Sequence, residues 1–144
     1  MRRVSDILAS KPSPQIHIIG PDDTVFAAIK AMEKNGIGAL LVLQDGALIG
    51  IVTERDYTRK IAVRSRKSRT TPVRAIMSTP VVSVGLRHTS DDCLLLMAKH
   101  QFRHLPVMDA GKLAGMISIR DLVDEIIADR RLLDVDQAVP VARS

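Results

Sequence analysis

Two heptapeptides in this chain of 144 residues match each other: Gly50-Ile51-Val52-Thr53-Glu54-Arg55-Asp56 and Gly115-Met116-Ile117-Ser118-Ile119-Arg120-Asp121. Both fit the pattern Gly-x-x-[Ser/Thr]-x-Arg-Asp. In each, an apolar stretch runs into a Ser or Thr that is followed three residues later by Asp, which predicts a strand that enters a capped helix. A shift of 65 positions also aligns residues 16–61 with residues 81–126 without a gap, and twelve of the 46 pairs are identical. The chain therefore contains one structural unit twice.

Both copies predict the same order of elements: a short helix, a brief strand, a helix capped by Thr24 or Thr89, a hairpin of apolar strands and a final helix. The hairpin turns fall at Asp45-Gly46 and Ala110-Gly111, where glycine permits a positive φ. Such a hairpin cannot bury its apolar face alone, so the copies are expected to pack sheet to sheet. The predicted fold is α+β, an α/β sandwich-like pair of tandem βαββα repeats with pseudo-two-fold symmetry.

The predicted segments are helix 4–9, strands 16–19, 39–43 and 48–52 and helix 54–62 in the first copy, and helix 73–77, strands 81–84, 105–108 and 113–117 and helix 119–128 in the second.

The repeat divides the chain into a first domain (4–62), a basic linker (63–72), a second domain (73–129) and a C-terminal tail (130–144). Upstream of the gapless alignment, residues 4–8 resemble residues 73–77 at a shift of 69. Hydrophobic residues make up 46% of the chain but aromatic residues only 2%, so the core must be aliphatic. That scarcity argues against nucleic-acid readers that stack bases on aromatic side chains.

Cysteine content and hydropathy exclude several classes of protein. The single cysteine, Cys93, excludes a disulfide framework and a thiolate zinc cluster. No apolar run reaches the ~18 to 20 residues that cross a bilayer, so no membrane partner is expected. Asp6 precedes any hydrophobic stretch, which is not typical of a signal peptide. We therefore expect a cytoplasmic protein.

Positive charge is concentrated in the middle of the chain. The net charge is +5, from 21 Lys and Arg against 16 Asp and Glu, yet residues 57–90 contain no acid. One interpretation is a solvated loop, and the other is a rim that attracts phosphates or an acidic partner. A nucleic-acid-binding surface is the corresponding alternative function. The cations of this window are Arg59, Lys60, Arg64, Arg66, Lys67, Arg69, Arg74 and Arg87.

The residue types in both heptapeptides suit a nucleotide at the point where the strand enters the helix. A helix N-terminus offers unpaired N–H groups and partial positive charge to a phosphate. The carboxylate can accept from ribose hydroxyls, and arginine pairs with phosphate. The same Ser/Thr-x-x-Asp spacing is also a plain helix cap, as Thr89 and Asp92 illustrate. Its repetition together with a strand, a Gly and an Arg favours the ligand site.

The duplicated unit, its two turns and the segment Arg103-His104-Leu105-Pro106-Val107 resemble cystathionine-β-synthase (CBS) domains arranged as a tandem pair, or Bateman module. The resemblance covers residues 4–129 with no catalytic domain attached, so the chain is similar to stand-alone two-CBS proteins. It implies a regulatory module, not an enzyme, that binds AMP, ADP, ATP, NAD or S-adenosylmethionine in clefts between the copies. It also implies a homodimer, which the apolar helix faces favour, and a regulated protein partner.

The resemblance further implies which residues contact the ligand. Asp56 and Asp121 would hold ribose hydroxyls, with Thr53 and Ser118 near ribose and phosphate. Adenine would lie against the early strands, and the phosphates would meet cationic side chains. The adenine candidates are His17, Ile18, Val82 and Ser83, and the phosphate candidates are Arg55, Arg103, His104 and Arg120.

The two copies carry different residues at several aligned positions. Where the second has Arg103-His104, the first has Gly38-Ala39, and Glu54 corresponds to Ile119. The two clefts are therefore not expected to be equivalent. The small residues of 36–39 either make room for a ligand or relieve packing.

The other candidate motifs do not predict a metal site, a reactive cysteine or a catalytic site. His100 and His104 have a metal-ligand spacing for a helix, but His104 is placed at a strand and no third ligand is near, so no metal is expected. Cys93 lies in an apolar helix beside Asp91 and Asp92, which predicts a core residue with a disfavoured thiolate. No triad, Walker loop or paired carboxylates indicate catalysis. A scaffold without a ligand, in which the turns are only caps, remains the third hypothesis.

Overall fold

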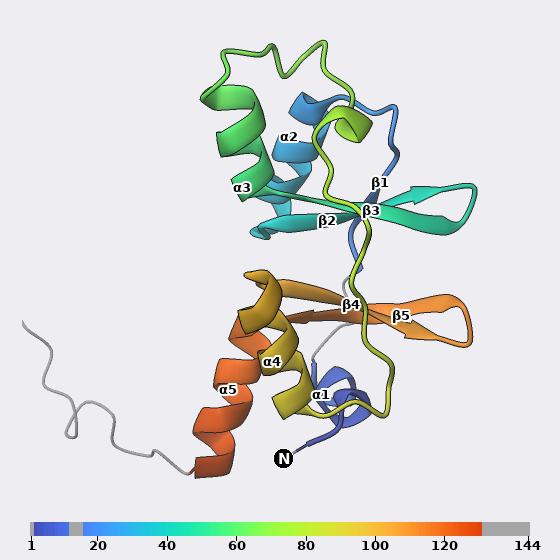
Figure 1. Cartoon of the computed structure of the whole chain (residues 1–144), viewed down its shortest axis with the longest axis vertical. Coiled ribbons are helices and arrows are strands. Elements are labelled where there is room, and N and C mark those ends of the chain that lie inside the picture. The colour runs from blue at the N-terminus through green and yellow to red at the C-terminus, as the bar shows by residue number, and fades with distance from the viewer. Residues whose placement is uncertain (1, 12–15, 131–144) are drawn as a thin grey trace, which may run out of the picture.

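The computed structural model describes residues 2–11 and 16–130, and side chains as far as residue 128. Two similar halves lie one above the other, with their sheets facing each other in the middle and their helices on the outside (Figure 1). This is the α+β pair of repeats with pseudo-two-fold symmetry that the sequence predicts. Except for residue 130, the predicted C-terminal tail lies outside the described residues.

The first half is a three-stranded sheet covered on its outer face by helices (Figure 1). Strand β1 pairs in parallel with β2, and β2 pairs antiparallel with β3. Helix α3 continues into a π-helical turn, Thr58–Ala62. The bounds are β1 Ile18–Ile19, α2 Val25–Asn35, β2 Ala39–Gln44, β3 Ala47–Thr53 and α3 Glu54–Tyr57.

The second half repeats this arrangement around an antiparallel pair, β4 and β5. It is preceded by a 3₁₀ turn at Val73–Ala75 in place of the predicted helix 73–77. The bounds are α4 Ser90–His100, β4 His104–Asp109, β5 Lys112–Ser118 and α5 Ile119–Arg130, with α1 Val4–Ser10 at the start of the chain.

The local signals of the sequence are confirmed. Thr24 caps α2, and Thr89 forms a capping box with Asp92 on α4. Both hairpin turns are left-handed at two successive residues, with φ values of 52° and 81° in the first turn and 49° and 80° in the second. This is the backbone that a two-residue hairpin with right-handed strand twist requires, and only its second residue is glycine.

The predicted strand 81–84 is wrong, because Val84 alone forms a parallel bridge, to Val107. In the first half the amide of Leu41 donates to the carbonyl of His17 at 3.0 Å. The residue equivalent to Leu41 is Pro106, which has no N–H to donate. The second copy therefore loses one ladder bond, and its early strand does not form.

Each half takes its leading segment from the other copy. Val4 and Ile7 of α1 are buried in the core of the second half, whereas Val73 and Ile76 are buried in the core of the first. Glycines make room for this exchange: a Cβ on Gly50 would lie 2.6 Å from Met77 Sδ, and one on Gly115 would lie 2.9 Å from Leu8 Cδ2. We retain 4–62 and 73–129 as a proposal for the repeat, while the packed halves cross that division.

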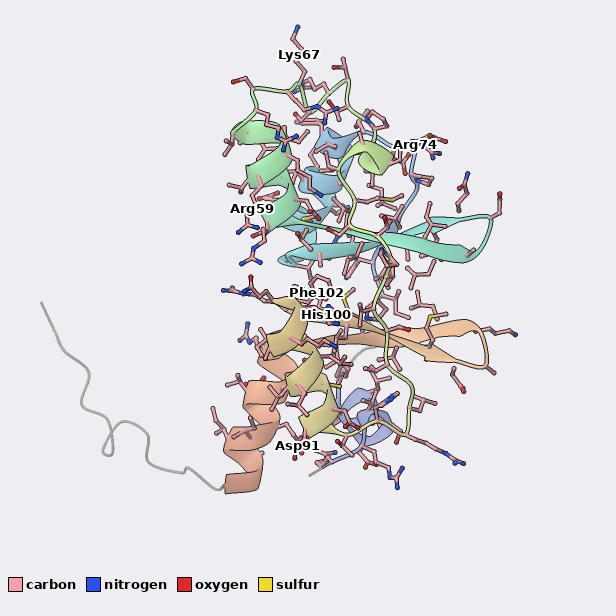
Figure 2. The ribbon with its side chains drawn as sticks, viewed as in Figure 1. Arg59, Lys67, Arg74, Asp91, His100 and Phe102 are labelled. Carbon is pink, nitrogen blue, oxygen red and sulfur yellow. The ribbon has the colours of Figure 1, made fainter. Side chains whose placement is uncertain are left out.

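The basic linker (63–72) is held against α2 by backbone contacts. The amide of Phe26 donates to Ser68, that of Val25 donates to Thr71, and Thr71 is buried. The guanidinium of Arg69 lies 3.9 Å from the centre of the Phe26 ring. Lys67 is at the outer end of the molecule (Figure 2). The linker is thus an ordered turn that carries its cations outward.

Across residues 2–11 and 16–130, no helix combines the length and apolar character that spanning a bilayer requires.

Candidate functional site

A cleft of about 610 Å³ opens between the two halves. This volume is within the range of ~300 to 1,000 Å³ typical of small-molecule sites. Its walls come from β3, α3 and the following π-helical turn of the first half, from the end of α4 and β4 of the second half, and from the segment 78–82 that connects the halves. It is lined by Gly38, Ile51, Thr53, Glu54, Arg55, Asp56, Arg59, Lys60, Ser78, Pro80, Val81, Val82, His100, Gln101, Phe102, Arg103, His104 and Pro106.

The first heptapeptide forms what we call the first corner, Thr53 to Asp56, where β3 enters α3. The amide of Asp56 donates to Thr53 Oγ1 at 3.1 Å, and the amide of Thr53 donates to Asp56 Oδ2 at 3.0 Å. This reciprocal capping box satisfies two amides that a helix start leaves unpaired. Asp56 is only 6% exposed, so its carboxylate is part of the wall of the cleft.

Two more groups occupy the other carboxylate oxygen of Asp56. Ser78 Oγ donates to Asp56 Oδ1 at 3.1 Å, and Lys60 Nζ lies 3.2 Å from the same atom. Lys60 also donates to the carbonyl of Ile76 at 2.8 Å. Both carboxylate oxygens therefore have partners within the protein, and a ribose hydroxyl at Oδ1 has to replace one of them.

Cations gather around the cleft from both halves. Arg55, Arg59 and Lys60 come from the first half, and Arg103 comes from the second. Arg55 also joins the halves, because its Nη1 donates to the carbonyl of Gln101 at 3.2 Å. Arg59 lies beside α3, and Phe102 lies between the two sheets (Figure 2). Such a rim favours an anionic ligand.

Two histidines and a phenylalanine form part of the second-half wall. The rings of His100 and Phe102 are stacked, with centroids 5.4 Å apart and planes 14° apart. Burial lowers the pKa of His104 below its usual 6.5; nearby Asp121 opposes this shift, while Lys11 adds to it. The imidazole of His104 is thus kept neutral near pH 7 and offers hydrogen bonds rather than charge.

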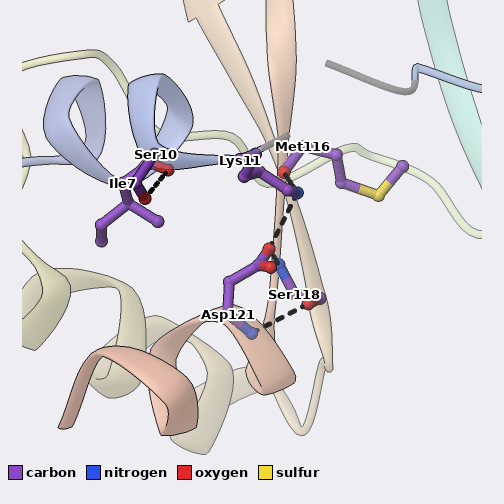
Figure 3. A network of polar contacts seen from close by, with 6 residues as sticks. All are labelled: Ile7, Ser10, Lys11, Met116, Ser118 and Asp121. Carbon is purple, nitrogen blue, oxygen red and sulfur yellow. Dashed lines mark hydrogen bonds and ion pairs between the residues drawn. The ribbon is translucent and has the colours of Figure 1, made fainter. Parts of the chain in front are cut away.

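The second heptapeptide forms the second corner, Ser118 to Asp121, where β5 enters α5. The amide of Asp121 donates to Ser118 Oγ at 3.1 Å, and the amide of Ser118 donates to Asp121 Oδ2 at 2.8 Å. The capping geometry is the same as in the first corner, but a different cation is present. Lys11 Nζ reaches across from the end of α1 to 2.9 Å from Asp121 Oδ2 (Figure 3).

The cleft brings together half of the side chains that the sequence proposes for a ligand. Their roles toward a ligand stay predictions. Those that line the cleft are Thr53, Arg55, Asp56, Val82, Arg103 and His104; those outside its lining are His17, Ile18, Ser83, Ser118, Arg120 and Asp121. The division follows the corners, because the first-corner residues lie in the cleft and the second-corner residues do not.

Several lining residues are not among the sequence-predicted ligand candidates. Lys60 follows Asp56 by four residues, a helical spacing that could have indicated the ion pair. Ser78 belongs to the leading segment of the second copy, and no local signal places it against the first. The lining residues absent from the ligand candidates are Arg59, Lys60, Ser78, Gln101 and, as an aromatic wall, Phe102, although Arg59 and Lys60 are among the cations of the acid-free window.

The cysteine prediction concerns a residue away from the cleft, whereas the metal prediction concerns His100 and His104, which line it. Cys93 is fully buried, and burial, with a smaller contribution from Asp92, raises the pKa of its thiol to about 11. The predicted core cysteine is confirmed. Among the described side chains, no three His, Cys, Asp or Glu residues lie close enough together to hold a metal ion.

Comparison with known proteins identifies similar chains. The family model of the CBS domain matches residues 4–63 and 73–128. The mitochondrial CBS domain-containing protein CBSX3 of Arabidopsis thaliana is 39% identical over 115 residues, which are 76% of this chain and 56% of that protein. CBS domain-containing protein YhcV of Bacillus subtilis is 34% identical over 108 residues, 75% of this chain and 76% of that protein. This chain thus spans little more than half of the Arabidopsis protein.

A solved structure supports the same relationship. A protein with CBS domains from Burkholderia ambifaria is 47% identical to this chain and superposes with a TM-score of 0.86. The superposition covers 89% of this chain and 96% of the other. The similarity therefore extends over both halves.

Proposed function

This chain belongs to the CBS-domain family as a tandem pair of CBS domains, and on that premise we propose that its cleft binds an adenine nucleotide and couples binding to the arrangement of the two halves. The observation that carries the proposal is the cleft itself. It has the volume of a nucleotide site, a cationic rim and walls from both halves. The proposed ligands are AMP, ADP, ATP and NAD, and the module itself is proposed to be regulatory rather than catalytic.

The phosphates of the ligand are assigned to the cationic rim. Arg103 is exposed and makes no ion pair with any described residue, so its guanidinium is available for a bidentate contact with phosphate. Arg59 and Arg55 lie on the opposite wall of the cleft. We propose that the ribose replaces Ser78, a neutral donor, at Asp56 Oδ1 while Lys60 stays paired with this carboxylate, and that the base lies against the apolar wall near Val82.

The contact between Arg55 and Gln101 suggests how binding changes the module. This bond links the two halves at the rim of the cleft. A phosphate that pairs with Arg55 competes with the Gln101 carbonyl and so exchanges a contact between halves for a contact with ligand. Binding would shift the population of inter-half arrangements, and a protein partner would detect that shift.

Calorimetric titration with AMP, ADP, ATP and NAD tests this proposal. We expect at least one nucleotide to bind, and the change Arg103→Ala to weaken that nucleotide by about tenfold or more, as loss of a charged hydrogen bond implies. Lys112→Ala, which removes an exposed cation of the same half away from the cleft, is the matched control and should bind as wild type does. If none of the four nucleotides binds or raises the unfolding midpoint, the ligand-free scaffold is the better description.

A second candidate function rests on the basic linker. Arg64, Arg66, Lys67 and Arg69 are exposed, and none of them forms an ion pair with a described residue. Such cations on an ordered turn suit a polyanion such as nucleic acid. The expected signature is an affinity that falls steeply with salt and is lost when the four cations are neutralised. Salt-independent or absent binding rules this function out.

We also propose a homodimer, formed through α4 and α5. Leu95 on α4 is 69% exposed, and Val123, Ile126 and Ile127 on α5 are 45%, 38% and 40% exposed. Sedimentation of wild type at low micromolar concentration should give twice the chain mass of 15.8 kDa. Leu95→Asp together with Ile127→Asp should give a monomer. A wild-type monomer would contradict the proposal.

The cytoplasmic location stays a prediction.

A further inference from the structure

Lys11, near the start of the chain, forms an ion pair with Asp121 at the second corner. It is the first residue after α1, and its side chain is 27% exposed. Its ammonium donates to Asp121 Oδ2 and to the carbonyl of Met116, each at 2.9 Å (Figure 3). Two of its three N–H donors therefore bind one carboxylate oxygen and one main-chain carbonyl of this corner. The stem of the side chain lies between α1 and β5 (Figure 3).

In the first corner, the equivalent carbonyl and the carboxylate have different partners. The residue equivalent to Met116 is Ile51, whose carbonyl accepts from the amide of Ser78 at 2.8 Å. The hydroxyl of Ser78 then serves the carboxylate of Asp56. The first corner lines the cleft, whereas at the second corner the ammonium of Lys11 lies against both the carboxylate and the carbonyl.

The local cation is also missing from the second corner. Lys60 of the first copy corresponds to Glu125, an acid, and Glu125 is paired with Arg2 at 2.6 Å. Asp121 therefore has no cation four residues away and takes its counter-ion from Lys11, 110 positions earlier. Lys11 thus supplies the positive charge at the second corner, on the carboxylate oxygen Oδ2, whereas Lys60 supplies it at the first corner on Oδ1.

We infer that Lys11 is an intramolecular occupant of the second corner and limits the chain to one nucleotide, bound in the cleft at the first corner. A ribose hydroxyl is a neutral donor, so it cannot replace an ammonium at a half-buried carboxylate without leaving the charge of Asp121 uncompensated. Lys11 therefore determines which copy binds. The inference rests on the proposed function, since it concerns the stoichiometry of the proposed ligand.

Titration of wild type, Lys11→Ala and Lys112→Ala with ATP and with AMP tests the inference. We expect one nucleotide per chain for wild type and for Lys112→Ala, and two per chain for Lys11→Ala, with the second site weaker. Two nucleotides per wild-type chain overturn the inference. So does one nucleotide per chain in a Lys11→Ala protein that unfolds cooperatively.

Amine labelling of the wild-type protein gives a second measurement that needs no nucleotide and no variant. Brief treatment with an acylating reagent, followed by mass spectrometry, should label Lys11 at least about fivefold more slowly than Lys112, the factor that corresponds to a contact of about 1 kcal/mol. Equal rates overturn the inference even where the nucleotide binds. If no nucleotide binds, the proposed function fails, and the labelling rates alone decide whether Lys11 occupies the corner.

Discussion

The two corners have the same capping residues and the same local geometry, yet they differ in what completes them. At the first, a serine and a lysine from nearby segments satisfy Asp56, and the corner lines the cleft. At the second, a lysine from the opposite end of the sequence satisfies Asp121. Duplication thus preserved the parts that depend on local sequence. The surroundings diverged, because a carboxylate can accept a hydrogen bond from any donor that the fold places beside it.

The largest expected difference between the corners is in the free energy of unfolding that is lost when each carboxylate is removed. Asp56→Ala should lower the free energy of unfolding by about 3 kcal/mol, because it removes a cap and leaves Lys60 and Ser78 without their buried acceptor. Asp121→Ala should cost about 1.5 kcal/mol, since its side chain is 19% exposed and Lys11 can turn to solvent. Urea denaturation measures both.

Asp124→Ala is the control for this pair, because Asp124 is exposed on α5 and should change stability by less than about 0.5 kcal/mol. Equal losses at both corners would show that the additional partners of Asp56 contribute nothing beyond the cap.

The glycines that admit the exchanged segments give the next largest effect. Gly50→Ala should cost about 2 kcal/mol and Gly115→Ala about 1 kcal/mol, because the new methyl group meets Met77 at 2.6 Å and Leu8 at 2.9 Å. Thermal unfolding provides the comparison. Gly38→Ala, whose methyl group would make an ordinary contact at 3.6 Å with Glu54, should be nearly neutral. Neutral behaviour at all three positions would contradict close packing of the exchanged segments.

The capping hydroxyls should distinguish the corners less. Thr53 Oγ1 contacts both the amide and the carboxylate of Asp56, whereas Ser118 Oγ accepts from the amide of Asp121. Thr53→Ala should therefore cost about 1.5 kcal/mol and Ser118→Ala about 1 kcal/mol in chemical denaturation. A larger loss at Ser118 would reverse the proposed order of the two corners.

The smallest effect concerns His104, which lies between the cleft and the second corner. Its folded-state pKa is lowered by burial, so below about pH 6.5 the unfolded chain binds more protons at this residue. Its contribution to stability is present above the unfolded pKa and is lost as the pH falls through the lower folded-state pKa. Lys11→Ala removes a cation that helps to lower this pKa, so NMR titration should find a higher pKa for His104 in that variant. An unchanged or lower pKa in Lys11→Ala would show that Lys11 does not help to lower the pKa of His104.

Much of the first corner was predictable because its signals are local. Thr53 and Asp56 are three residues apart, and the hairpin turns and helix caps likewise depend on neighbours in sequence. The failure of the early strand in the second copy was also readable in principle, since Pro106 lacks an amide. Ser78 and Lys11 were not predictable as parts of the corners, because nothing in their own neighbourhoods points to the acids that they contact.

The amino-acid sequence alone establishes the duplication, the α+β order of elements, the capped strand-to-helix corners and the membership of each copy in one family. These properties rest on hydrogen bonds and apolar periodicity within a few residues. Tertiary structure decides that the leading segments are exchanged, that the cleft opens at the first corner and that Lys11 reaches Asp121. Those outcomes depend on how two complete halves dock, and docking joins groups up to 123 positions apart whose pairing no local pattern encodes.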